Sequence, residues 1–180
     1  IIINSTLICC VIIIMFFTFI CHPAKIIVES VVANMNDRAI TYSEILQEGE
    51  LLNIESNVDP RTPLSAELKE RILELIMFRI IVFEEARSEG VTIDESKIQE
   101  KVKTYLSNVY MKDFRKTYSI SDLEFNTMIK IRLTADKMTE IFLDKKFKGK
   151  TPSKEEKQKA VTEWQKNLLK KQKLVLYSIP

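Results

Sequence analysis

Hydrophobic periodicity divides the chain into strands near its two ends and helices between them. Residues 26–36, IIVESVVANMN, are rich in valine and isoleucine and predict a strand, with a turn at Asn36 and Asp37 and a short returning strand after it. The last residues, KLVLYSIP, alternate with a period of two and predict another strand. Because only helical patterns lie between them, we expect the first and last strands to pair.

Capping signals mark where several of the helices begin. In a capping box, a hydroxyl and a carboxylate three residues apart satisfy free backbone N–H groups. Three pairs fit this pattern: Thr41 with Glu44, Ser121 with Glu124, and Ser153 with Glu156. Between the first two pairs, a helix opening near Ser65 and ending at Gly90 contains the stretch ILELIMFRIIVF, which is apolar on nearly every side. We therefore place that helix at the centre of the core.

The remaining helices complete a mainly α fold. A capped helix follows Gly90, a short one is predicted around MKDFRKTY, and a long one carries an apolar stripe that includes Ala135 and Met138. The last helix runs from Lys154 to about Gln172, with Trp164 assigned to the core. The predicted fold class is thus a helical core with a small β pairing of the N-terminal and C-terminal strands.

The apolar stretch at 7–20, LICCVIIIMFFTFI, is the strongest signal near the start of the sequence. No charged side chain precedes Lys25, and a run of this length suits the hydrophobic part of a secretory signal. We expect residues 1–24 to be an export signal or an uncleaved membrane anchor. Residues 25–180 then form the exported domain, with an N-terminal part at 25–148 and a C-terminal helix and strand at 153–180.

Charge is distributed unevenly along the chain. The formal net charge is only +2. Residues 29–100 hold 16 acids and 7 bases, however, whereas residues 145–173 hold 11 lysines and 3 glutamates. Pairing of the two ends would bring these regions together. The lysine-rich run from Lys145 to Lys159 is expected to be a solvated face, with anionic lipid or acidic client as the alternative, and we expect no nucleic-acid partner.

Cysteine and histidine are confined to the predicted export segment. The cysteines are Cys9, Cys10 and Cys21, and the only histidine is His22. The domain at 25–180 therefore lacks the residues for Cys/His zinc sites, thiol nucleophiles and Ser–His–Asp triads. Its glycines are far apart, so no phosphate-binding loop is indicated. We expect no catalytic residue, no metal and no cofactor.

The order of these segments resembles a known family. VVANMNDRAIT, then LKERILELIMFRIIVFEEARSEGVTIDESKIQEKV, then MIKIRLTADKM and finally TEWQKNLLKKQKLVLYSI are similar to the SurA-type periplasmic chaperones, which belong to the parvulin-carrying foldases. The resemblance covers about residues 28–179. In that family, parvulin domains usually occupy the gap between the long helix and the terminal one, where this chain has only KGKTPS. The resemblance therefore implies a chaperone core without peptidyl-prolyl isomerase activity.

The resemblance implies an ATP-independent holdase in the periplasm that binds unfolded outer-membrane or secreted polypeptides. Aromatic and methionine side chains give adaptable contacts, so the candidate client-binding residues are those in and around the least regular stretch, residues 107–120. They are Tyr105, Tyr110, Met111, Phe114 and Tyr118. The alternative for these residues is ordinary packing in the core. The alternative function is a scaffold at the inner membrane that binds one folded envelope partner. The oligomeric state stays open.

Overall fold

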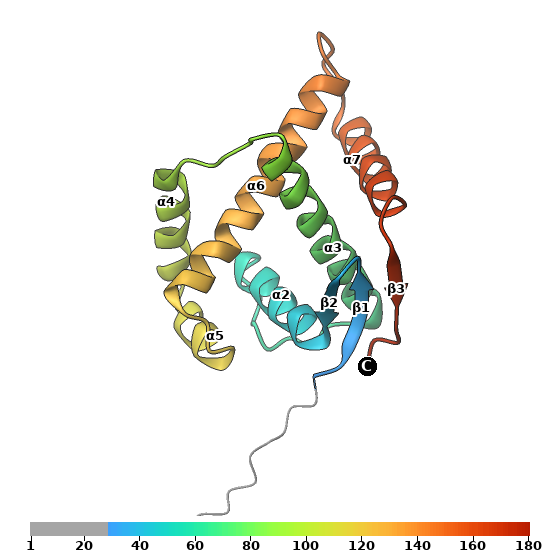
Figure 1. The fold of residues 1–180 in the computed structure, drawn as a ribbon. Coiled ribbons are helices and arrows are strands. Elements are labelled where there is room, and N and C mark those ends of the chain that lie inside the picture. The colour runs from blue at the N-terminus through green and yellow to red at the C-terminus, as the bar shows by residue number, and fades with distance from the viewer. Residues whose placement is uncertain (1–28) are drawn as a thin grey trace, which may run out of the picture.

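The computed structural model describes residues 29–180 as a mainly α fold with a small antiparallel sheet (Figure 1). The predictions for residues 1–24 and for the first residues of the N-terminal strand lie outside the described residues. The elements are β1 (Val31–Met35), β2 (Arg38–Thr41), α2 (Tyr42–Glu55), α3 (Ala66–Ser88), α4 (Glu95–Leu106), α5 (Met111–Thr117), α6 (Asp122–Lys146), α7 (Lys154–Leu169) and β3 (Leu174–Leu176).

The first and last strands pair, as predicted. The strand order is β2-β1-β3, so β1 lies between its hairpin partner and the last strand of the chain. The hairpin turns at Asn36, whose φ of 55° is a left-handed conformation that asparagine tolerates. On the other side, β1 and β3 are antiparallel, with Asn34 opposite Val175. Tyr177 donates its N–H to the Val32 carbonyl at 3.0 Å, so the pairing continues beyond the strand itself.

Helix α3 occupies the centre of the molecule, as its apolar sequence predicts. It begins after Ser65, whose Oγ accepts a hydrogen bond from the Leu68 N–H, and it ends just before Gly90 at a φ of 70°. It packs against α2, α6 and α7. Its buried residues are Ile72, Leu73, Met77, Phe78, Ile80, Ile81, Val82 and Ala86.

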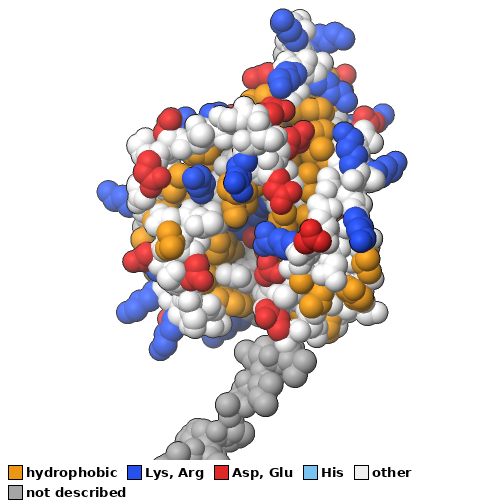
Figure 2. Space-filling model, in the orientation of Figure 1, with side chains coloured by type: hydrophobic (Ala, Val, Ile, Leu, Met, Phe, Trp, Pro, Cys, Tyr) orange, Lys and Arg blue, Asp and Glu red, His pale blue; other side chains and the backbone are white. Residues whose placement is uncertain are grey.

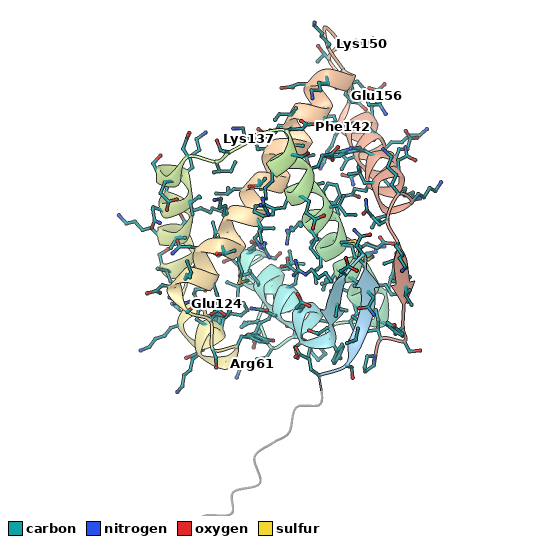
Figure 3. The ribbon with its side chains drawn as sticks, in the orientation of Figure 1. Arg61, Glu124, Lys137, Phe142, Lys150 and Glu156 are labelled. Atoms are coloured by element: carbon teal, nitrogen blue, oxygen red, sulfur yellow. The ribbon has the colours of Figure 1, made fainter. Side chains whose placement is uncertain are left out.

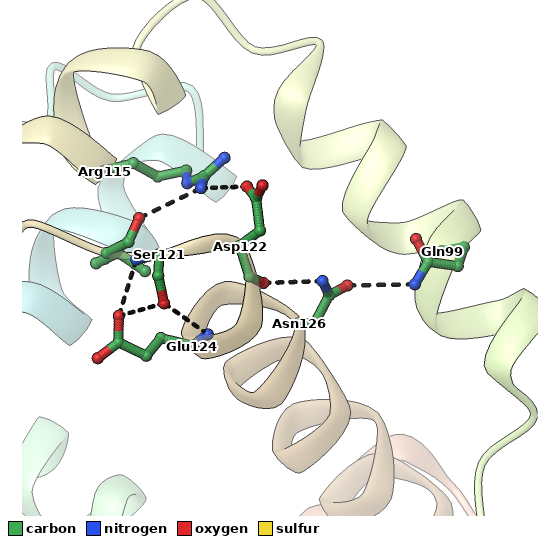
Figure 4. A network of polar contacts seen from close by, with 7 residues as sticks. Gln99, Arg115, Ser121, Asp122, Glu124 and Asn126 are labelled. Atoms are coloured by element: carbon green, nitrogen blue, oxygen red, sulfur yellow. Dashed lines mark hydrogen bonds and ion pairs between the residues drawn. The ribbon is translucent and has the colours of Figure 1, made fainter.

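All three predicted capping boxes are formed. Figure 4 shows the box at the start of α6, where the Ser121 N–H donates to Glu124 Oε2 at 2.8 Å and the Glu124 N–H donates to Ser121 Oγ at 3.2 Å. The same helix end joins its neighbours. Arg115 of α5 pairs with Asp122 at 2.5 Å, and the Asn126 side chain accepts a hydrogen bond from Gln99 of α4 at 3.4 Å.

Two apolar cores lie along α6. The first joins the inner side of the sheet, α3, the second half of α6 and α7. Trp164 packs against this core as predicted, stacked on Phe142 with a centroid distance of 4.5 Å and edge-on to Phe78 at 5.4 Å. The second core joins the end of α2, α4, α5 and the first half of α6.

Helix α7 ends three residues earlier than the sequence pattern suggests. Lys171 and Gln172 form a turn, in which their N–H groups donate to the carbonyls of Leu168 and Leu169. This turn lets the Lys173 carbonyl accept a hydrogen bond from the Asn36 N–H at 2.8 Å, at the start of the β1–β3 ladder. Pairing with β1 therefore outweighs the helical preference of these residues.

Candidate functional site

The five residues predicted from the sequence to bind clients do not form one surface. Tyr105, Met111 and Phe114 are buried in the second core, and Tyr118 packs against it half-buried. Only Tyr110 is exposed, with 41% of its surface accessible. Because a buried side chain cannot touch another polypeptide without local opening, we correct the predicted contact set and assign Tyr105, Met111 and Phe114 to packing.

The aromatic rings of this group stabilise the second core by contacts with one another. Tyr105 lies edge-on to Phe125 with a centroid distance of 6.0 Å, and Phe114 is 5.2 Å from Tyr118. Burial and a hydrogen bond to Glu50 raise the pKa of Tyr118. Met111 and Phe114 lie on the face of α5 that packs inward, whereas Tyr110 precedes the helix and is exposed.

A group of buried charges, which the sequence analysis missed, links α2, α3 and α6. Glu48 of α2 pairs with Arg79 of α3 at 2.5 Å and also with Arg132 of α6. Arg132 pairs in addition with Glu55 at 2.6 Å, and Glu55 accepts a hydrogen bond from the Tyr105 hydroxyl. Desolvation alone would lower the pKa of Arg132, but the attraction of Glu48 and Glu55 outweighs it and raises the pKa. The guanidinium therefore stays charged.

Four residues of this cluster line a polar cleft of about 460 Å³ beside α4: Glu55, Arg79, Tyr105 and Arg132. Lys101 and Asp136 also line it. Each arginine in the cleft already has a carboxylate partner, so the cleft offers little unbalanced charge to a ligand. We interpret the cluster as a structural connection between the two cores.

A signal for the cluster was present in the sequence. Arg79 is the one charge inside the apolar run that follows Glu74 in α3. Arg132 lies three residues after Ile129 and seven after Phe125, which places it on the buried stripe of α6. A charge at a core position needs a partner of opposite sign, and α2 supplies two.

A second concave site, a groove of about 540 Å³, lies between α3 and the C-terminal strand. We call it the α3–β3 groove. Its apolar lining comes from α3, from the end of α7 and from the C-terminal residues: Leu73, Met77, Leu169, Leu174, Leu176 and Ile179. Lys69, Glu70 and Glu74 form its polar edge. Lys69 donates to the Pro180 carbonyl at 2.7 Å, which holds the C-terminal residues along the helix.

Apolar side chains remain exposed on this side of the molecule. Val175, Leu176 and Tyr177 expose 45%, 58% and 48% of their surfaces. Figure 2 shows hydrophobic surface over the region that β3 occupies in Figure 1. An apolar patch of this kind, edged by charges of both signs, is typical of a surface that contacts another polypeptide. The α3–β3 groove is therefore the candidate functional site.

The lysine-rich connection between α6 and α7 lies far from this groove. Figure 3 places Lys150 at the tip of the α6–α7 hairpin, and Figure 2 shows basic side chains gathered there. Lys146 pairs with Glu163 at 3.6 Å, and Lys145 lies 4.0 Å from Glu89. Glu89 belongs to the acid-rich residues 29–100, whereas Glu163 lies within the lysine-rich residues 145–173.

Within residues 29–180, no group of histidine, cysteine, aspartate and glutamate side chains is arranged to hold a metal ion. Across the same residues, no helix combines the length and hydropathy needed to cross a bilayer.

No model of a known protein family matches the chain, and a search of curated proteins finds no match either. The resemblance to the SurA-type chaperones therefore stays a prediction.

Proposed function

We propose that this protein is an ATP-independent chaperone of the holdase type, which binds unfolded outer-membrane or secreted polypeptides in the periplasm. The observation that carries the proposal is the α3–β3 groove, which combines an apolar lining, a polar edge and exposed Leu176 and Tyr177. A holdase needs such a surface because it competes with aggregation by weak, adaptable apolar contacts. The order of segments shared with the SurA-type chaperones supports the same proposal.

Light scattering by several unrelated denatured clients, measured without nucleotide, tests the proposal. We expect the full chain to suppress scattering and the Leu176→Asp variant to suppress it much less, because a carboxylate would then lie in the groove. Leu123→Asp is the matched control, since Leu123 is 77% exposed and is not part of the groove lining. Equal suppression of scattering by the two variants would show that clients bind elsewhere on the protein.

The same assay separates the holdase from an envelope scaffold. Stoichiometric capture of one folded partner, with no suppression of scattering for any client, would favour the scaffold. We further propose that the chain has no isomerase activity of its own, because only a short connection joins α6 to α7. A prolyl-peptide isomerisation assay should show no acceleration above the uncatalysed rate.

Export is tested separately. We propose that residues 1–24 direct the chain out of the cytoplasm, and the N-terminal residue of protein recovered from an envelope fraction decides between cleavage and anchoring. Lys25 at that end would indicate a cleaved signal. Retention of the apolar stretch in a membrane pellet would indicate an anchor, and recovery only from the cytoplasm would contradict the periplasmic assignment.

A further inference from the structure

Strand β3 has one edge paired and one edge free. The Lys173 carbonyl accepts from the Asn36 N–H just after β1, and the Tyr177 N–H donates to the Val32 carbonyl of β1. Val175 lies opposite Asn34 in the same alternation. In an antiparallel pair the intervening residues direct their N–H and C=O groups away from the partner. These are Leu174 and Leu176, whose main-chain groups have no hydrogen-bond partner among residues 29–180.

The other edge of the sheet is protected. Strand β2 continues directly into α2, and it carries Arg38, which pairs with Glu44 at 3.0 Å. Charged side chains and short strands commonly prevent unwanted pairing at sheet edges. Strand β3 reads Leu-Val-Leu and has neither a charge nor a proline. Only one of the two edges is therefore suited to accept another strand.

The free edge and the α3–β3 groove face the same space. Leu174 and Leu176 lie opposite Met35 and Ala33 in the register, and both line the groove. A chain laid along β3 would direct alternate side chains toward Leu73 and Met77 of α3, because side chains alternate between the two faces of a strand. The same chain would find main-chain partners at Leu174 and Leu176.

We propose that the α3–β3 groove binds its client by strand addition. An extended segment with alternating apolar side chains pairs with β3 as a fourth strand, in the order β2-β1-β3-client. The proposal rests on the holdase function for the source of the segment. The free main-chain groups decide for an extended occupant, because a helix has already satisfied its own backbone groups. The edge of the groove carries one base and two acids, Lys69, Glu70 and Glu74, so its charge selects the client only weakly.

Peptides with blocked amides test this mode of binding. The probe is a seven-residue peptide of alternating valine and threonine, capped at both ends. It is compared with two methylated twins of the same sequence, one N-methylated on the valines and the other on the threonines. Only every second residue of an added strand directs its N–H to β3, so one twin should bind about tenfold more weakly or worse and the other should bind nearly normally. Equal binding by both twins would overturn strand addition.

The identity of the affected twin also gives the strand direction. In an antiparallel pair, the peptide residues opposite Leu176 direct their side chains to the same face as Leu176 and exchange hydrogen bonds with its main chain. These are the valines, because the apolar side chains face the groove, so N-methylation of the valines would block binding. In a parallel pair, the peptide residues that hydrogen-bond to Leu176 lie beside Val175, and their side chains face away from the groove. These are the threonines, so N-methylation of the threonines would block binding. Either result supports strand addition.

A proline substitution at the free edge of β3 tests the contribution of the protein's own main-chain groups to peptide binding. Leu176→Pro removes an N–H that faces away from β1, so the β1–β3 hydrogen bonds made at Val175 and Tyr177 are retained. Leu176→Ala is the matched control, which loses the same side chain and keeps the N–H. We expect the proline variant to bind the unmethylated peptide about tenfold more weakly than the alanine variant. Equal affinities of the two variants would contradict the proposal.

Amide hydrogen exchange in the unmodified chain keeps the test independent of any variant. Bound peptide should slow exchange at Leu174 and Leu176. Unchanged exchange at these two amides with peptide bound would overturn strand addition. So would a β3-dependent dimer in sedimentation, because a second copy would then occupy the edge. In either case, continued suppression of client scattering would leave the holdase function standing.

Discussion

Arg132 shows how one side chain joins the two halves of the molecule. It lies on α6 between Ile129 of the second core and Ala135 of the first, and it bonds to two glutamates of α2. Its side chain is 9% exposed. At this burial, losing one partner leaves the others charged and desolvated, which costs far more than the intact pair contributes.

Replacing Arg132 by methionine should lower the free energy of unfolding by about 3–5 kcal/mol, because Glu48 loses one of its two partners and Glu55 its only arginine. Urea denaturation measures the change. The matched control is Arg71→Met, which removes an exposed pair with Glu67 on α3 and should cost less than about 1 kcal/mol. Similar losses for both variants would show that the cluster is no better coupled than a surface pair.

Ionisation of Asp136, which lines the polar cleft, should lower the stability of the fold as the pH rises. Carboxyl groups in proteins more often have the opposite effect. Burial raises the pKa of its carboxyl group above 3.8, although Arg79, Arg132 and Lys101 attract the charged form. The folded state therefore favours the protonated acid, and ionisation costs stability at neutral pH. Asp136→Asn should unfold at higher urea than the wild type at pH 7, and the difference should narrow as the pH falls toward 4.

Asp59 provides a control of opposite sign. Its hydrogen bonds with Arg61 lower the pKa of its carboxyl group, so ionisation favours the folded state above pH 3.8 and the gain is lost as the pH falls. Asp59→Asn should therefore unfold at lower urea than the wild type at pH 7. Midpoint shifts of the same sign for the two variants would contradict the assignment of Asp136.

At the scale of elements, helix starts were predictable because they depend on neighbours in the sequence. Thr41, Ser121 and Ser153 each cap a helix with a carboxylate three residues later, and the hydrogen bonds of the box need no distant contact. The end of α7 and the inward direction of Phe114 depend on other elements instead. Local pattern alone could not show which face of α5 is covered, nor that α7 would end at Leu169 rather than continue to about Gln172.

Substitution of Ser121 measures the contribution of a single cap. Ser121→Ala should lower the free energy of unfolding by about 1 kcal/mol, because the Glu124 N–H loses its acceptor at the start of α6. Ser121→Gly should cost only a few tenths of that amount, since water can reach the freed groups and glycine adopts the cap conformation easily. Chemical denaturation of the two variants compares them directly, and a larger loss for glycine would argue against a capping role.

At the scale of the whole molecule, the β1–β3 pair fixes the two ends of the described chain together. The groove was not predictable, because it forms only when the last strand lies beside α3, which precedes it by many tens of residues in the sequence. Pairing of the ends was also expected to bring the acid-rich residues 29–100 near the lysine-rich residues 145–173. Lys145, which lies 4.0 Å from Glu89, makes one such contact.

A disulfide between positions 34 and 175 should stabilise the fold. Asn34 and Val175 are directly opposite in the ladder, at a separation typical of disulfides, and the bond would close a loop of about 140 residues. In a chain whose three cysteines are replaced by serine, Asn34→Cys with Val175→Cys should raise the free energy of unfolding by about 4 kcal/mol when oxidised. Adding a thiol reductant should remove the gain, and an unchanged urea midpoint on oxidation would show that these positions do not pair.

The pairing of β1 with β3 also fixes the order in which this protein can be completed. A chain that emerges residue by residue, from a ribosome or through a membrane, presents β1 and its hairpin partner long before β3 exists. Until then one edge of β1 is open, and its Val32 and Met35 lack part of their cover. The growing chain therefore carries an unpaired strand edge, and only the residues of β3 end that exposure.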